Sequence, residues 1–395
     1  MRARRPAERP LGVYVHFPYC TRRCPYCDFA VHARRRIPHE AYAEAVIAEL
    51  AARAALFPGR AAVTAYFGGG TPGLWRADRL AAVLDEIRAR YALALDAEVT
   101  VEVNPGELDL EHLAELRRRG VTRLSIGAQS FDDRSLRLLG RGHDARAGRT
   151  AVELARQAGF DNVSVDLIFG LPGQGRGALD VELEALLALD VEHLSLYGLT
   201  VEPRTAFAAL ERAGDLTLPA PERQAELYER VSVRLAAAGY AQHEISSWAR
   251  PGRAARHNAI YWRQGEYLGV GSSASSLRLG AGGGERFANH RSVDRYLAAC
   301  RAAGPGTDRV ADDARVATTE QLGAEALARE ALWLGLRLTD GIDRGDHAAR
   351  FGVDPLATPA FAKLVAAGLV ESDDRRVRLT SRGRLLADEV GAALV

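Results

Sequence analysis

The stretch "VHFPYCTRRCPYCDFAVH", residues 15–32, holds three of the four cysteines of the chain. Cys20, Cys24 and Cys27 have the spacing C-x₃-C-x₂-C, and no fourth cysteine follows nearby. Eight-residue clustering of three thiols is improbable for unrelated core cysteines. The stretch therefore predicts a metal site, and the open question is which group takes the fourth position.

Zinc and an iron–sulfur cluster both fit three cysteines. A structural zinc site usually takes four Cys or His ligands, so His16 or His32 would have to complete the set. An iron–sulfur cubane is held by cysteine thiolates, and three thiolates leave one iron open for another molecule. We favour the cluster, because the cysteine loop directly follows a predicted strand at an edge where other polar loops converge.

Composition places the chain among globular proteins. Its 395 residues suggest two or three domains, and its hydrophobic content is 47% with 26% charged residues. The formal net charge of +1 gives no global field that would recruit nucleic acid or membrane. No apolar run is long enough to span a bilayer, and no secretory signal is recognisable. Few cysteines, most of them clustered, favour a reducing cytoplasm.

An alternation of strand and helix runs from residue 11 to about 200. Short β-branched runs are each followed by a loop and an amphipathic helical pattern. The predicted strands are 12–17, 62–67, 98–103, 122–127, 162–169 and 192–199. This order predicts an α/β fold whose parallel sheet has helices on both faces. Periodicity alone leaves a doubly wound sheet and a full or partial barrel equally open.

Polar or Gly-rich segments recur where these strands end. They read "GGGTP", "VEVNP", "GAQSF", "DLIFGLPGQ" and "YGLTVEP". Parallel α/β folds bind their ligands at this edge. The convergence of five such loops predicts a site there.

The pattern changes after residue 240. We predict a core domain over 1–240, a connecting region over 241–315 and a C-terminal domain over 316–395. The last segment reads helix, strand, tight turn, strand, helix, which is typical of a small winged-helix-like module. We favour a structural role for this module over nucleic-acid binding, because no basic stripe accompanies it.

The cysteine spacing, Tyr26 beside the last cysteine and "GGGTP" after the second strand together resemble the radical S-adenosylmethionine (SAM) superfamily. The resemblance covers essentially the whole chain. It implies a partial (β/α)₆ barrel similar to a TIM barrel, with a C-terminal α+β extension. It also implies a [4Fe-4S] cluster on Cys20, Cys24 and Cys27, whose open iron chelates the amino and carboxylate groups of SAM.

The same resemblance assigns SAM contacts to other residues. Gly69 and Gly70 lack side chains, so we expect their backbone amides to approach a ligand closely. Thr71 adds a hydroxyl at the same edge. Glu102 is an acid on an otherwise apolar strand, and the resemblance places it against the ribose or amino group of SAM.

The resemblance also assigns the remaining cofactor-binding residues. The list comprises Tyr14, Tyr26, Gln129, Arg141 and Asp166. Asp166 lies inside a strand that looks buried, where an unpaired carboxylate would be costly. We expect a buried partner such as Arg141 to compensate it.

The motifs are similar to the branch that contains oxygen-independent coproporphyrinogen III oxidase and the HemW heme chaperones. Three features favour the chaperones. Phe29 stands where the oxidase has a further cysteine. The first strand begins by residue 12, without the longer N-terminal segment of the oxidase. The stretch "RHNAIYW" (256–262) matches the H-N-x-x-Y-W motif associated with heme. His257 is the candidate axial ligand of heme.

Two functions follow from the resemblance. The first is a cytoplasmic heme chaperone that binds heme and delivers it to hemoproteins such as cytochromes, without oxidase activity. Its cluster and SAM would serve assembly, dimerisation or redox control. The resemblance leaves open whether the chain forms a homodimer and whether it contacts a membrane through the acceptors. The alternative is a radical SAM oxidase that decarboxylates porphyrinogen propionates.

Overall fold

The computed structural model describes residues 10–280, 282–302 and 309–394. Residues 1–9, 281, 303–308 and 395 lie outside the described residues, and with them the two ends of the chain and part of the predicted connecting region. The predicted domain boundaries at 240 and 315 stay predictions.

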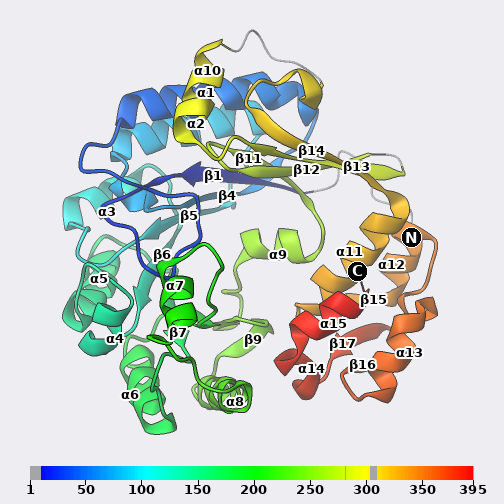
Figure 1. The fold of residues 1–395 in the computed structure, drawn as a ribbon. Coiled ribbons are helices and arrows are strands. Elements are labelled where there is room, and N and C mark those ends of the chain that lie inside the picture. Colours follow the sequence, from blue (N-terminus) through cyan, green and yellow to red (C-terminus); the bar gives the residue numbers. More distant parts are fainter. Residues whose placement is uncertain (1–9, 281, 303–308, 395) are drawn as a thin grey trace.

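A curved twelve-stranded sheet dominates the molecule (Figure 1). Its strand order is β14-β13-β12-β11-β1-β4-β5-β6-β7-β8-β10-β9. Neighbouring strands from β1 through β8 in this order pair in parallel. These six strands are β1 (Leu11–Phe17), β4 (Ala62–Gly69), β5 (Glu98–Val103), β6 (Arg123–Gln129), β7 (Val163–Phe169) and β8 (His193–Gly198). They coincide closely with the six predicted strands.

Helices cover the convex face of this sheet (Figure 1). They are α1 (His39–Arg53), α2 (Ala77–Tyr91), α3 (Leu110–Arg118), α4 (Asp133–Leu138), α5 (Ala145–Gln157), α6 (Arg176–Leu187) and α8 (Pro221–Ala237). The expectation of helices on both faces was wrong, because the sheet curves and encloses its other face. The fold is a partial barrel, as the resemblance implied.

Alternation along each strand separates the two faces. In β1, Leu11, Val13, Val15 and Phe17 are fully buried beneath the helices, and the residues between them face the concave side. A side-chain period of two is what a strand dictates. The concave side therefore carries polar residues from every strand, and we call the space it encloses the barrel lumen.

Further elements extend both edges of the barrel. β11 (Glu266–Val270) pairs in parallel with β1, and β12 (Ser275–Gly280), β13 (Gly283–Asn289) and β14 (Val316–Gly323) continue the sheet in antiparallel fashion. β10 (Ser247–Ala249) and β9 (Ala241–Glu244) follow β8 at the other edge. The short helix α9 (Arg256–Trp262) lies between the two edges (Figure 1), so it occupies the opening of the barrel.

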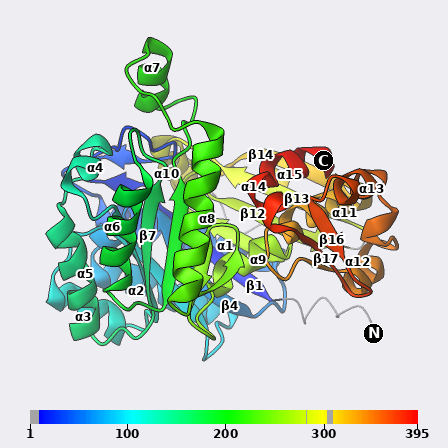
Figure 2. The same ribbon diagram turned by 90° about the horizontal axis from the view of Figure 1, so that it is seen from below.

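The C-terminal module lies to one side of the barrel (Figure 2). It contains α11 (Ala324–Leu336), α12 (Arg344–Phe351), α13 (Pro359–Ala366), α14 (Ser381–Leu385), α15 (Ala387–Leu394) and the strands β15 (Ile342–Asp343), β16 (Val370–Ser372) and β17 (Arg376–Leu379). The three strands form one small sheet. Leu332, Phe361 and Val377 belong to its own hydrophobic core. This arrangement matches the helix and strand order predicted for a winged-helix-like module.

Two other α-helices lie in the described part of the chain. α10 (Val293–Ala302) follows β13 and contacts α1. α7 (Ala206–Ala213) stands on an arm that projects from the barrel next to the end of β8 (Figure 2). Among the described residues, no helix combines the length and apolar character needed to cross a membrane.

Candidate cluster and cofactor site

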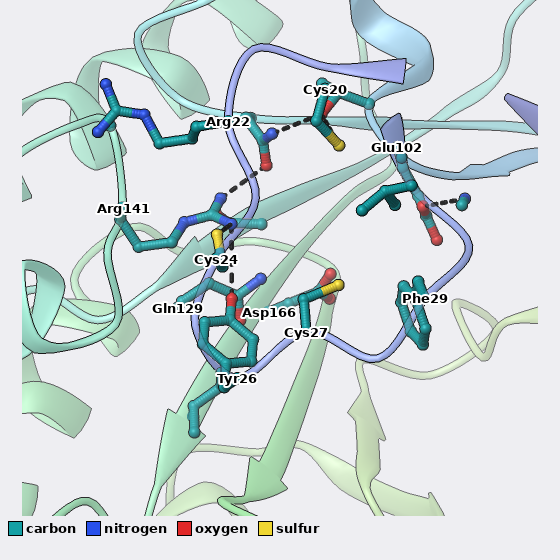
Figure 3. Close-up of a pocket in the computed structure, with 18 of the residues that line it drawn as sticks. Cys20, Arg22, Cys24, Tyr26, Cys27, Phe29, Glu102, Gln129, Arg141 and Asp166 are labelled. Carbon is teal, nitrogen blue, oxygen red and sulfur yellow. Dashed lines mark hydrogen bonds between the residues drawn. The ribbon is translucent and has the colours of Figure 1, made fainter. Parts of the chain in front are cut away.

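A cavity of about 600 Å³ opens at the carboxyl ends of the parallel strands. Eleven of the thirteen predicted site residues line it. These are Cys20, Tyr26, Cys24, Cys27, Gly69, Gly70, Thr71, Glu102, Gln129, Arg141 and Asp166. Residues from six separate segments therefore meet at the predicted edge (Figure 3). Tyr14 and His257 are not among the lining residues.

The cysteine loop follows β1 and folds over this cavity. The loop is held by β2 (Tyr19–Cys20), which pairs with β3 (His32–Ala33), and by a turn in which the Cys27 amide donates to the Cys24 carbonyl at 3.2 Å. All three thiols reach the cavity (Figure 3). None of the three cysteines is in a disulfide, so all three are available to a metal.

Cys20 and Cys27 hold their thiol protons in the absence of metal. Burial raises the pKa of Cys20 to about 11 and also raises the pKa of Cys27. Iron binding therefore has to displace protons, as is general for thiolate ligands. Two donors already face the sulfurs: Thr71 Oγ1 lies 3.5 Å from Cys20 Sγ, and Arg141 Nη1 lies 3.6 Å from Cys24 Sγ. Such donors suit sulfurs that carry negative charge in a cluster.

Histidine does not complete a zinc set here. The His16 ring is bonded through Nδ1 to the Tyr14 hydroxyl and through Nε2 to the Ala30 carbonyl, both at 3.0 Å. In the described residues, no group of three or more His, Cys, Asp or Glu side chains surrounds a single ion. Thiolates of a cubane bind separate irons and need no such convergence. The donor set thus fits the cluster better than zinc.

The glycines after β4 are required by packing. A Cβ on Gly69 would lie 2.4 Å from the His16 ring, and one on Gly70 would lie 2.6 Å from the Tyr19 carbonyl oxygen. Their amides are also engaged, since Gly69 donates to Glu102 Oε2 at 3.0 Å and Gly70 donates to the Phe17 carbonyl at 2.7 Å. Close approach of these amides to a ligand stays a prediction, and in the structure both amides are bonded within the chain.

Glu102 is a buried acid beside the cavity. Its Oε1 accepts from the Tyr66 hydroxyl at 2.8 Å. Burial raises the pKa of Glu102 to about 7, so this carboxyl gains a proton near neutral pH. A cationic ligand that entered the cavity would favour its ionised form.

Arg141 joins the cysteine loop to the ends of β5 and β6. Its Nη2 donates to Asn104 Oδ1 at 2.6 Å and to the Gly127 carbonyl at 2.7 Å, while Nη1 lies 3.5 Å from the Tyr26 hydroxyl (Figure 3). Its Nε is buried without a partner. Asn104 in turn donates to Thr71 Oγ1 at 2.8 Å. Arg141, Asn104 and Thr71 thus form a continuous hydrogen-bonded chain beneath the cysteine loop. The Nε atom of Arg141 is left to donate to a ligand.

Asp166 is hydrogen-bonded to a serine, while the charge of Arg141 attracts it without direct contact. Ser125 Oγ lies 3.3 Å from both of its carboxylate oxygens, whereas Arg141 is occupied by Asn104 and Gly127. Burial raises the pKa of Asp166. Gln129 ends β6 with a positive φ of 67° at a register shift of the strand, which turns this residue toward the cavity edge.

Sequence reasoning missed Asn104, Tyr66 and Ser125. Asn104 precedes the proline of "VEVNP", and its place at a strand end was the available signal. Ser125 lies on the same face of β6 as Gly127 and Gln129, which also line the cavity. Tyr66 lies on β4 directly before the glycines. Each of them forms a hydrogen bond to a predicted site residue.

His257 lies inside the barrel rather than in the cavity. It is 2% exposed, its Nδ1 is bonded to Thr64 Oγ1 at 2.8 Å, and its Nε2 is bonded to the Tyr261 hydroxyl at 2.9 Å. Burial lowers the pKa of His257 to about 3, so the ring is neutral. Ligation of heme iron requires the loss of one of these hydrogen bonds, and the role of His257 stays a prediction.

Comparisons with known proteins agree with this geometry. Residues 14–186 match the family model for the radical SAM superfamily, and residues 322–386 match the model for the HemN C-terminal domain. The chain is 36% identical to the heme chaperone HemW of Bacillus subtilis over 97% of this chain and 99% of that protein. The chain belongs to the HemW family.

Two further similarities support this assignment. The heme chaperone HemW of Mycobacterium tuberculosis (strain H37Rv) is 38% identical over 98% of this chain and 95% of its own length. The structure of coproporphyrinogen III oxidase (HemN) from Escherichia coli, described as a radical SAM enzyme, aligns with a TM-score of 0.81 at 27% identity. That alignment covers 99% of this chain and 91% of the oxidase chain. The predicted membership in the radical SAM superfamily and the predicted fold are confirmed.

Proposed function

We propose that this protein is a heme chaperone that binds heme and delivers it to hemoproteins. The observation that carries the proposal is the full-length similarity to the B. subtilis protein named heme chaperone HemW. Phe29 supports it, because this side chain stands at the cavity, 64% exposed, where the oxidase branch has a further cysteine.

We propose that Cys20, Cys24 and Cys27 hold a [4Fe-4S] cluster. When bound, the cluster offers an open iron to the amino and carboxylate groups of SAM and can supply an electron for cleavage of a C–S bond. The side chains around it suit that ligand. The Arg141 guanidinium is matched to a carboxylate, and the Glu102 and Asp166 carboxyls are matched to the positive charges of SAM.

We propose His257 as the axial ligand of heme. Its neutral imidazole is the form that binds iron. Release from either Thr64 or Tyr261 would free one ring nitrogen. The acceptors we propose are cytochromes and other cytoplasmic or membrane-attached hemoproteins, with any membrane contact made through the acceptor. A homodimer and a cytoplasmic location complete the proposal.

Anaerobic titration with heme tests this function. We expect heme to bind, with an absorption band that differs from that of free heme, and to leave on addition of an apo-hemoprotein. Absence of heme binding at micromolar protein would contradict the proposal. The test is made on the full chain with the cluster reconstituted.

The alternative function is that of a coproporphyrinogen III oxidase. The observation that favours it is the structural similarity to HemN from E. coli. Anaerobic incubation with coproporphyrinogen III, SAM and a reductant decides between the two. We expect no protoporphyrinogen, and its formation at catalytic rates would establish the oxidase.

A further inference from the structure

The cysteine loop carries an excess of positive charge. Residues 21–36 hold five arginines and one acid, in a chain whose formal net charge is only +1. β2 and β3 pair in parallel, so the residues that follow both strands leave them in the same direction and lie at the same edge of the loop. The five arginines, all exposed, are Arg22, Arg23, Arg34, Arg35 and Arg36, and we call them the basic rim.

Most of this charge is not neutralised by direct contacts within the chain. Arg34 lies 3.9 Å from Asp294, and both side chains are exposed. In the part of the chain that the structure describes, the side chains of the other four arginines form no hydrogen bond or ion pair. The basic rim is therefore free to meet the charges of another molecule.

The acids at the cavity mouth do not cancel the basic rim. Asp28 lies 3.3 Å from Arg204 and 3.9 Å from Arg291, so two further arginines share this carboxylate. Glu107 and Glu202 also line the cavity. Arginines nevertheless outnumber acids around the mouth, which leaves a positive potential toward solvent.

An exposed aromatic side chain lies on the same loop. Phe29 is 64% exposed, lines the cavity together with Arg22, and lies in the sequence between the two arginine runs (Figure 3). Aromatic residues with charged residues around them are typical of the centre of a protein–protein interface. An apolar centre with a basic surround therefore fits a protein that presents an acidic face.

The cysteines of this loop indicate what such a protein would deliver. A cluster that supplies an electron for cleavage of a C–S bond must first receive one. Cys300 is the one cysteine of the chain outside the loop, and a single thiolate cannot hold a second cluster as a relay. Electron transfer slows steeply with distance, so the donor has to dock close to the cysteine loop. The basic rim and Phe29 belong to that loop.

We propose that the basic rim and Phe29 form the docking surface for a small acidic protein that carries one electron on a flavin or an iron–sulfur centre. The proposal rests on the proposed function, because it takes the cluster on the three cysteines as given. Carboxylates of the carrier pair with the arginines, and Phe29 packs against the apolar surface beside the redox centre. The carrier is oxidised by one electron and the cluster is reduced by one, and no bond forms or breaks.

Rapid mixing of the reconstituted chain with a reduced acidic flavodoxin tests the proposal. We expect the second-order rate of cluster reduction to fall about tenfold or more as the salt is raised from low to high concentration. Arg35→Gln/Arg36→Gln should slow the reduction about tenfold at low salt and leave the rate at high salt unchanged. Phe29→Ser should weaken the binding of the oxidised flavodoxin about tenfold, as measured by calorimetry. Arg375→Gln/Arg382→Gln, which removes two exposed arginines of the C-terminal module, is the matched control and should behave as the wild type.

Several outcomes would overturn the proposal. Reduction that does not depend on salt, or that is equally fast in Arg35→Gln/Arg36→Gln and the wild type, would exclude docking on the basic rim. Salt-dependent binding of flavodoxin that does not accelerate reduction would show a surface for an acidic protein that delivers no electron. Binding to vesicles of phosphatidylglycerol that is lost in the same variant, with flavodoxin binding retained, would assign the surface to a membrane instead.

Failure of the proposed cluster gives a different result. Wild-type chain that takes up no iron would contradict the cluster, whereas a full cluster that every variant reduces at the same rate would contradict the docking surface alone. Iron content and the midpoint potential of each variant show whether a slower rate comes from the cluster rather than from docking. If Arg35→Gln/Arg36→Gln takes up less iron, the affinity of its cluster-free form for oxidised flavodoxin decides the question, and an affinity equal to that of cluster-free wild type would overturn the proposal.

Discussion

The cavity edge and the barrel lumen differ in how their polar groups are satisfied. At the edge, the cysteine thiols lie open to the cavity, and Arg141 and Asn104 form a bonded chain behind them. In the lumen, His257 has hydrogen-bond partners on both ring nitrogens. The difference teaches that a side chain with suitable chemistry can bind a ligand directly only where neighbouring residues do not already occupy its donors and acceptors.

The largest expected effect concerns the cysteine loop. Cys24→Ala should reduce the iron bound after anaerobic reconstitution from about four atoms per chain to nearly none, because a cubane on two thiolates is not retained. Cys300→Ala removes the one cysteine outside the loop and is the matched control. Iron and acid-labile sulfide analysis measures both. Retention of a full cluster in Cys24→Ala would refute the ligand assignment.

The next effect concerns SAM. Arg141→Gln should weaken SAM binding about 10- to 100-fold, since a hydrogen bond to a charged group contributes roughly 1.5–3 kcal/mol. Calorimetry on the reconstituted protein measures the affinity, with iron content as the control for an intact cluster. An unchanged affinity at normal iron content would remove Arg141 from the SAM site.

Substitutions at and beside His257 test whether this lumen residue is only structural or also binds heme. His257→Ala leaves the Thr64 and Tyr261 hydroxyls unpaired, so we expect a loss of about 2–4 kcal/mol in the free energy of unfolding together with weaker heme binding. Tyr261→Phe is the informative partner variant, because it removes one hydrogen bond and keeps the imidazole. It should keep the absorption spectrum of bound heme. The same spectrum in His257→Ala would exclude His257 as a ligand.

The last expected effect is a gradual one, a dependence of the free energy of unfolding on pH. The pKa of Glu102 is about 7 in the folded chain and close to its ordinary lower value when unfolded, so the folded state binds this proton more tightly. Stability from this group is fully present at low pH and declines as pH rises toward 7. Glu102→Gln should therefore flatten the decline between pH 5 and pH 8 by roughly 2–3 kcal/mol. Denaturant unfolding without SAM measures it, and parallel curves would contradict it.

Much of the fold could be predicted from the sequence. The six parallel strands and their polar ends follow from period-two alternation and short-range signals, and both survive in the structure. The curvature that turns the sheet into a partial barrel could not be predicted from these local patterns, because it depends on how all the strands pack together. Gly70, Thr71 and Gln129 reach the cavity because they end or follow strands. Arg141 lies in the loop after α4, and only the resemblance assigned it to the site.

The hydrogen-bond partners of the site residues could not be predicted from the sequence. Arg141 was expected to compensate Asp166, and its charge does attract that acid. Its donors, however, go to Asn104 and to the Gly127 carbonyl, and the hydrogen bond to Asp166 comes from Ser125. The sequence also showed no sign that the Gly69 and Gly70 amides are bonded within the chain. These choices depend on side chains that come together only after the strands are aligned in register.

Heme transfer tests the central claim most directly. The heme-loaded, cluster-containing protein is mixed anaerobically with the apo form of a b-type cytochrome, and the visible spectrum is followed over time. We predict that the cytochrome spectrum appears at the expense of the heme-loaded chain, faster than from free heme at the same concentration. Heme that stays on the chain, or that reaches the cytochrome only at the rate seen with free heme, would contradict the chaperone function.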